Sequence, residues 1–207
     1  MRDWFFWGII GTIIVATAAS AVGVRDTATT WLLEAAPVLI VVPILILTHR
    51  SFRLTNLLYV LILIHALVIL YGAHYSYAHV PLGDWMSRVA GWERNNYDKI
   101  GHLMQGFCPV IAIREVLLRK TPLERGKWLS FISVAIALAI SACYELFEWA
   151  ASLTAPNDTE AFLGTQGYIW DTQSDMFCCL IGAILSLILL SRLHNRQIQK
   201  LILNTKL

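Results

Sequence analysis

The sequence predicts an all-α fold, a polytopic membrane helix bundle of about six transmembrane helices with both termini in the cytoplasm. The composition indicates a membrane protein, because 57% of the 207 residues are hydrophobic, 14% are charged, and the mean hydropathy is +0.60. Apolar runs recur along the whole chain, at the roughly 20 residues that one span needs. Lys and Arg gather in alternate connections. We therefore expect residues 1–207 to form a single integral-membrane domain.

Six apolar runs are long enough to be spans. The first begins almost at the N-terminus and exceeds the roughly 7–15 apolar residues of a signal peptide, so we expect an uncleaved anchor. The fourth has the weakest apolar character, since it carries four polar or charged side chains. We keep it as a span because the basic connections fall on one side of the membrane, as the positive-inside rule requires, only if the number of spans is even. The predicted spans are Trp4–Val24, Trp31–Thr48, Leu54–Ala73, Lys99–Leu118, Trp128–Ala150 and Asp171–Ser191.

The basic residues predict the orientation of the bundle. Eleven Lys and Arg residues fall in the N-terminus, the second–third and fourth–fifth connections and the C-terminal tail, against four on the opposite side. Cytoplasmic loops carry the excess of positive charge, so these segments and both termini should be cytoplasmic. Tryptophans should mark the two interfaces. The outer belt would contain Trp31, Trp85, Trp92, Trp149 and Trp170, and the inner belt Trp4, Trp7 and Trp128.

Two outer connections, His74–Asp98 and Ala151–Trp170, contain Pro, Gly and Trp and are too apolar for plain linkers. We expect them to lie on the bundle as lids or interfacial segments. The stretch "FLGTQG", residues 162–167, predicts tight turns at its glycines.

Several classes of function find no support in the sequence. The net charge of +2 gives no nucleic-acid footprint. No Ser nucleophile elbow, P-loop, HExxH or dinucleotide fingerprint occurs. The cysteines lack CxxC spacing and lie in apolar runs, which predicts small buried side chains. They are Cys108, Cys143, Cys178 and Cys179.

Polar residues in the last three spans follow helical spacing. Because these spans alternate in direction, their ionisable groups should meet at one depth near the outer surface. Each span contributes one helical face. These faces contain Asp98, His102 and Gln105 in the fourth span, Ser141, Glu145 and Glu148 in the fifth, and Asp171, Asp175 and Gly182 in the sixth.

Five carboxylates and one histidine cannot all be charged at close range without compensation by protons or cations. Carboxylate and imidazole ligands suit a divalent metal ion, and helical bundles build metal sites from paired ligands on facing helices. The sequence therefore predicts metal ligands at His102, Glu145, Asp175 and Asp171. The predicted catalytic groups are Glu145, Glu148 and Asp98.

Each of these residues also has a structural interpretation. Asp98 and Asp171 open helices and are candidates for N-capping. His102 is also consistent with a hydrogen-bonded core histidine, and Glu148 with a side chain that reaches water at the membrane surface.

At "YDKIGHLMQG", "YELFEW", "FLGTQGYIWD" and "DMFCCLIGA" the chain resembles the YjdF-like family of uncharacterised bacterial inner-membrane proteins. This resemblance implies a multi-pass plasma-membrane protein and brings no established activity with it. More loosely, the order "DK..H", a glutamate in the next span, and "D...D" with a glycine in the last is similar to the VanZ-like membrane proteins. Those are linked to glycopeptide-antibiotic resistance, and "YELFEW" differs from their usual glutamate–glutamine pairing.

Three functions remain open at this point. The first is a metal-assisted hydrolase or transferase that acts on lipid-linked or envelope substrates. The second is a small transporter, although the path to the cytoplasm is apolar except for Arg114–Glu115, which we expect to form a structural or snorkelling ion pair. The third is a scaffold or sensor in which the cluster locks helices together. His65, isolated in the middle of the third span, is expected to serve packing or hydrogen bonding and not to be a ligand.

Overall fold

The computed structural model describes residues 3–154 and 166–205, and within these ranges the chain forms helices and no strand. The all-α prediction is confirmed. The elements are α1 (Asp3–Ser20), α2 (Ala28–Thr48), α3 (Asn56–Tyr75), the 3-10 turn η1 (Tyr77–His79), α4 (Pro81–Ala90), α5 (Tyr97–Phe107), α6 (Pro109–Lys120), α7 (Lys127–Thr154) and α9 (Asp171–Thr205).

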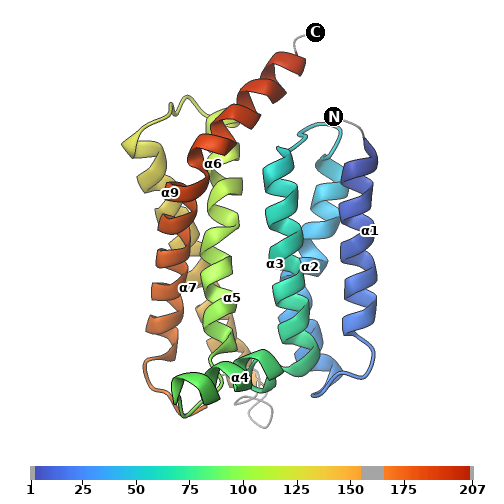
Figure 1. Cartoon of the computed structure of the whole chain (residues 1–207), viewed down its shortest axis with the longest axis vertical. Coiled ribbons are helices and arrows are strands. Elements are labelled where there is room, and N and C mark those ends of the chain that lie inside the picture. Colours follow the sequence, from blue (N-terminus) through green and yellow to red (C-terminus); the bar gives the residue numbers. More distant parts are fainter. Residues whose placement is uncertain (1–2, 155–165, 206–207) are drawn as a thin grey trace.

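Five of these helices, α1, α2, α3, α7 and α9, are long and apolar enough to cross a membrane. The fourth predicted span instead forms two short helices, α5 and α6, stacked end to end (Figure 1). The break falls at Cys108 because Pro109 has no backbone N–H to donate to the preceding turn. The total of six crossings therefore stays a prediction.

The last helix extends beyond its predicted end. At about 1.5 Å per residue, its 35 residues span about 52 Å, more than the roughly 30 Å hydrocarbon core. Beyond Ser191 the helix continues because His194 and Ile198 stay buried against the bundle. The start of α1 and the end of α9 lie at the same end of the molecule (Figure 1), as an even number of crossings requires.

The helices form two groups that meet along α3 and α5. Helices α1 and α2 pack on α3, whereas α7 and α9 pack around α5 and α6. Helix α4 lies across the end of the bundle opposite the termini (Figure 1). It is amphipathic, with its Gly83 and Ser87 face buried, and so has the character predicted for the outer connection His74–Asp98.

The closest helix contact is the crossing of α5 and α9, which two glycines permit. A Cβ atom on Gly106 would lie 1.9 Å from the backbone oxygen of Cys179, and one on Gly182 would lie 2.0 Å from that of Leu103. Small residues allow such close backbone approach between membrane helices. The crossing places the first turns of α5 and α9 side by side, which positions the candidate site.

Two predictions about side-chain exposure have different outcomes. The cysteines were predicted to be buried, and Cys108 and Cys179 are. The prediction is wrong for Cys143, which is exposed because it lies on the open inner face of α7. Tryptophans are exposed at both ends of the bundle, as interface anchors would be. The exposed tryptophans are Trp4, Trp7, Trp85, Trp92, Trp128, Trp149 and Trp170.

The second outer connection is described only in part. The predicted turn at Gly164 lies outside the described residues. Gly167 has a φ of +81°, the left-handed conformation that glycine favours, so the predicted turn exists at the end of "FLGTQG".

Candidate functional site

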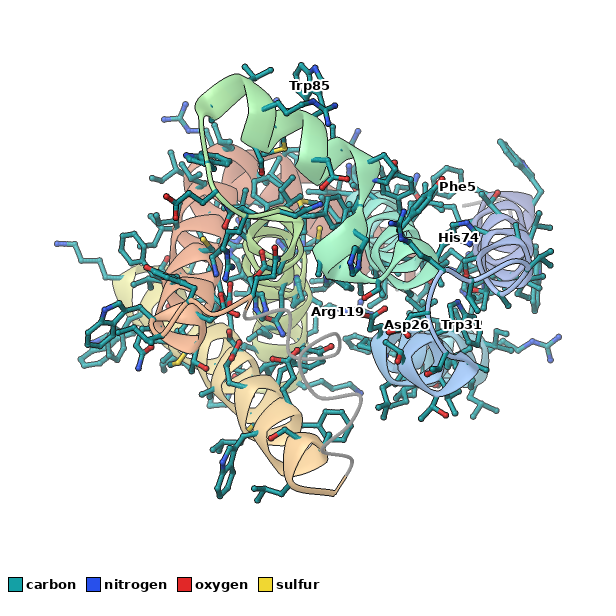
Figure 2. All side chains as sticks on the ribbon, turned by 90° about the horizontal axis from the view of Figure 1, so that it is seen from below. Phe5, Asp26, Trp31, His74, Trp85 and Arg119 are labelled. Atoms are coloured by element: carbon teal, nitrogen blue, oxygen red, sulfur yellow. The ribbon has the colours of Figure 1, made fainter. Side chains whose placement is uncertain are left out.

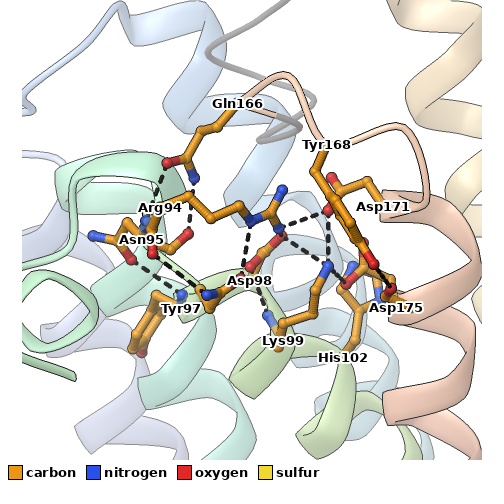
Figure 3. Close-up of polar contacts among 12 residues, drawn as sticks. Arg94, Asn95, Tyr97, Asp98, Lys99, His102, Gln166, Tyr168, Asp171 and Asp175 are labelled. Carbon is orange, nitrogen blue, oxygen red and sulfur yellow. Dashed lines mark hydrogen bonds and ion pairs between the residues drawn. The ribbon is translucent and has the colours of Figure 1, made fainter. Parts of the chain in front are cut away.

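Two cations and three aspartates form an ion-pair cluster where α5 and α9 begin (Figure 3). Arg94 donates to Asp98 at 2.9 Å and to Asp171 at 2.6 Å. Lys99 donates to Asp171 at 2.7 Å and to Asp175 at 2.8 Å. Because one oxygen of Asp171 accepts from both cations, this aspartate serves mainly to balance their charge.

The loop before α5 is held in place by an asparagine clamp, which fixes the position of Arg94 (Figure 3). The Asn95 side chain donates to Asp84 at 2.7 Å, and its backbone N–H and C=O both bond the amide side chain of Gln166. The loop before α9 is thus tied to the loop before α5. This clamp was not predicted, because it depends on a contact between segments 71 residues apart.

A second group lies one turn deeper and contains His102, Glu145 and Asp175. One ligand atom of each residue lies within 4.8 Å of the others. The shortest approach is 3.6 Å between His102 Nε2 and Glu145 Oε1. Glu145 is only 8% exposed, and among the described residues its Oε1 has no hydrogen-bond partner. A buried carboxylate oxygen without a protein partner is costly unless it binds a proton, an ion or water.

The orientation of His102 suits metal binding. Its Nδ1 lies 3.0 Å from Gln105 Oε1, an atom that can only accept, so Nδ1 carries the proton. In the neutral ring, the lone pair of Nε2 then faces Glu145. Histidine ligands of metal ions are commonly held in this way by a hydrogen bond at the other ring nitrogen.

The cluster has an excess of negative charge. Glu148 lines the same cavity as Asp98, His102 and Asp175, so five carboxylates face two cations, Arg94 and Lys99. The difference of five minus two leaves three carboxylates for protons or an added cation to balance.

The structure thus brings all the predicted site residues to one end of the bundle, but in two groups. The deeper group contains His102, Glu145 and Asp175; among the described residues Glu145 pairs with no Lys or Arg, whereas Asp175 also pairs with Lys99. Asp98 and Asp171 belong to the ion-pair cluster, and although they also converge with Asp175, Arg94 and Lys99 occupy that space. The N-cap position of α5 is Asn96, but Asp98 Oδ1 accepts from the backbone N–H of Lys99 at 2.8 Å, so Asp98 does satisfy a backbone donor of the first turn.

A cavity of about 830 Å³ extends from this cluster along the inner faces of α2 and α7, with α3, α5 and α6 behind it. Most of its lining is apolar. Figure 2, seen from the α4 end, shows α2 and α7 as two separate arms on the same side of α3 and α5. His65, expected to serve packing, also lines this cavity.

Glu34 of α2 is a cavity residue that the sequence analysis missed. It is only 3% exposed, and among the described residues neither carboxylate oxygen has a hydrogen-bond partner. The available signal was a lone carboxylate in an apolar span, which by itself indicates a functional position.

The opposite end of the bundle holds a separate buried network around Glu115, which is fully enclosed. Its carboxylate accepts from Thr55 at 2.7 Å, Arg119 at 2.8 Å and His194 at 3.0 Å. Arg114 donates to His194 Nδ1 at 2.8 Å and to Asn195. The expected pairing of Arg114 with Glu115 is therefore wrong, because successive helical residues point to different sides.

Comparison with known proteins supports the membrane assignment. Residues 5–196 match the family described as "Predicted membrane protein (DUF2238)". The chain is 48% identical to "Inner membrane protein YjdF" of Escherichia coli (strain K12) over 171 residues, which cover 83% of this chain and 82% of that protein. No solved structure matches the chain.

Proposed function

The chain belongs to the DUF2238 family of predicted membrane proteins, and from this premise we propose that it is a metal-assisted hydrolase or transferase of the bacterial inner membrane. His102, Glu145 and Asp175 would hold a divalent metal ion, and the substrate would be a lipid-linked envelope molecule. The observation that carries the proposal is the buried, unpartnered Glu145 Oε1, 3.6 Å from a histidine nitrogen whose lone pair is free.

The distances support a site that a metal could close. Tetrahedral ligands about 2.1 Å from zinc are roughly 3.4 Å apart, close to the 3.6 Å between His102 and Glu145. Asp175 is within 4.8 Å of both, so a shift of about an ångström would complete a three-ligand site. A dication would also balance two of the three uncompensated charges.

The chemistry follows from such an ion. Metal coordination lowers the pKa of bound water to about 7 and so supplies hydroxide at neutral pH. Glu148, which lines the cavity beside the cluster, would take the proton that this water loses. The water oxygen would bond to the phosphorus or carbonyl carbon of the substrate while the bond from that atom to the leaving oxygen breaks, and Glu148 would pass its proton to the leaving oxygen. In a transferase, an acceptor hydroxyl would replace water.

Two alternatives make different use of the same groups. A transporter needs a path through the bundle, whereas Glu115 and its partners fill the opposite end with a buried network. A scaffold is favoured by the ion pairs of Arg94 and Lys99, which join α5 to α9. A measurement of metal binding distinguishes the enzyme hypothesis from the scaffold hypothesis.

The direct test is metal analysis of detergent-purified protein after equilibration with Zn²⁺ or Mn²⁺. We expect one ion per chain, and at least tenfold weaker binding in Glu145→Gln, as loss of a ligand or its support gives. Glu93→Gln, an exposed residue of the neighbouring loop, is the matched control and should bind normally. Absence of bound metal in the wild type would leave the scaffold as the better interpretation.

A double mutant tests whether the group acts as one site. Glu145→Gln combined with Asp175→Asn should bind metal little worse than either single variant, because ligands of one site are not independent. Additive losses would contradict a shared site.

A further inference from the structure

We propose that the cavity between α2 and α7 binds one hydrocarbon chain of a membrane lipid with a primary ammonium headgroup, and that Glu34 and Glu148 recognise the ammonium. This inference names the substrate class of the proposed enzyme and in that sense rests on the proposed function.

The apolar part of the cavity has the dimensions of a lipid chain. On α2 its lining runs from Glu34 to Thr48 and passes Val38, Val41 and Leu45. At about 1.5 Å per residue this distance is about 21 Å, longer than the roughly 15 Å half-thickness of the hydrocarbon core. Exposed apolar side chains such as Val41, Ile44 and Phe147 line the cavity, so it opens to the apolar surface of the bundle and a chain from the adjoining leaflet can lie along it.

The polar end of the cavity is formed by residues of both arms. Glu34 comes from α2 and Glu148 from α7, and both line the cavity beside Tyr77 and Tyr144. Neither glutamate takes part in an ion pair of the described residues. Together with Glu145, these two carboxyl groups form the part of the acidic end that no Lys or Arg of the described residues balances.

Tyr77 is placed in this end by two glycines. A Cβ atom on Gly72 would lie 2.5 Å from its ring and one on Gly101 would lie 3.0 Å away, so the ring fits between α3 and α5 only because both residues lack side chains. Burial, together with the neighbouring Tyr144 and Glu34, raises the pKa of Tyr77 well above its usual range. Its hydroxyl therefore stays protonated and can donate to a ligand.

The charge at this end selects the headgroup. A lipid whose headgroup is only anionic would bring more negative charge toward Glu34 and Glu148 and would be repelled. A primary ammonium group brings one positive charge and three N–H donors, which match carboxylate acceptors. A trimethylammonium group carries the same charge but has no N–H, so hydrogen bonding separates these two lipid types.

Cys143 reports on occupancy of the cavity, because it is exposed and lines the wall on α7. Cys178, half-buried and outside the cavity, is an internal control in the same chain. The experiment measures maleimide labelling of both cysteines by peptide mass spectrometry in detergent. The added lipids are phosphatidylethanolamine, phosphatidylcholine or phosphatidylglycerol with identical acyl chains.

Phosphatidylethanolamine should protect Cys143 at about tenfold lower concentration than phosphatidylglycerol, the effect of one charge-assisted hydrogen bond. Phosphatidylcholine should fall between them, and Cys178 labelling should not change. Glu34→Gln should reduce this preference to about twofold or less, and Glu148→Gln, on the other wall, should act in the same direction. Glu93→Gln should retain the full preference. Equal protection by the three lipids, or a preference that survives both variants, would overturn the proposal.

Failure of this inference is distinguishable from failure of the proposed function. If metal binds at His102, Glu145 and Asp175 but Cys143 shows no lipid preference, the headgroup assignment is wrong and the metal site stands. If the preference is present and no metal binds, the cavity is an aminolipid site without the proposed chemistry.

Discussion

The two ends of the bundle use the same residue types in opposite ways. Near the termini, His194 accepts from Arg114 at Nδ1 and donates to Glu115 from Nε2, so both ring nitrogens are occupied. At the other end, His102 donates from Nδ1 to Gln105, and its Nε2 faces Glu145 without a donor between them. One histidine has every hydrogen bond it can make, and the other keeps a free lone pair.

The difference separates a structural lock from a binding site. The network around Glu115 is enclosed and both oxygens of its carboxylate accept hydrogen bonds, and such networks fix one arrangement of helices. The cluster around Glu145 has an excess of carboxylates and adjoins a large cavity. Buried polar groups without partners are rare in folded proteins, so a deficit of this kind points to a ligand.

The largest effect concerns membrane topology, since the comparison assumes that the two ends face different compartments. A reporter active only outside the cytoplasm should be silent when fused after Leu207, because the tail carries four basic residues. The same reporter inserted at Gly91, in the loop at the opposite end, should be active. Activity at the C-terminus would mean that the number of crossings is odd, with the segment of α5 and α6 the first to re-examine.

The next effect is on stability at the lock. Glu115→Ala leaves His194, Arg119 and Thr55 without their shared acceptor and should lower the free energy of unfolding by about 3–5 kcal/mol. Glu124→Ala, in the exposed loop at the same end, should change it by less than about 0.5 kcal/mol. Unfolding in mixed detergent micelles measures both. Equal stabilities would show that the network does not lock the helices.

A smaller loss of stability is expected at the crossing of α5 and α9, which joins the two ends of the bundle. Gly106→Ala forces a methyl group against the backbone of α9, which cannot move aside as a side chain can, and should cost about 1–3 kcal/mol. Gly11→Ala is the control, because that position of α1 has open space and helix propensity favours alanine by up to about 1 kcal/mol. The two Gly→Ala changes should therefore have opposite signs. A stabilising Gly106→Ala would contradict the close crossing.

Sequence patterns predicted the all-α membrane fold and the meeting of polar faces from α5, α7 and α9, because helical periodicity places residues such as Asp98 and His102 on one side. They did not predict which carboxylates form ion pairs, because Arg94 and Asp171 are 77 residues apart in the sequence. The break at Cys108 depends on a single proline. Glu34 was missed because nothing near it in the sequence reveals that α2 faces α7 across a cavity.

The smallest expected effect tests most directly whether the cluster around Glu145 differs from the network around Glu115. With metal removed by a chelator, Glu145→Gln keeps the side-chain shape and removes one charge from a cluster with three too many carboxylates. It should leave the free energy of unfolding unchanged or raise it by up to about 1 kcal/mol, because like-charge repulsion falls and the amide oxygen can still accept the hydrogen bond that Thr172 makes to the carboxylate.

Glu115→Gln is the matched change in the network around Glu115, where it weakens the hydrogen bonds from Arg119 and His194. It should lower the free energy of unfolding of the metal-free protein by about 2 kcal/mol. Saturating metal at about 100 times its Kd should then stabilise the wild type by about 2.7 kcal/mol and Glu145→Gln by much less. If Glu145→Gln instead destabilises the chelated protein as Glu115→Gln does, Glu145 has structural partners and both ends of the bundle are locks. The sign of one substitution, measured without metal, thus decides whether the two histidines have different roles.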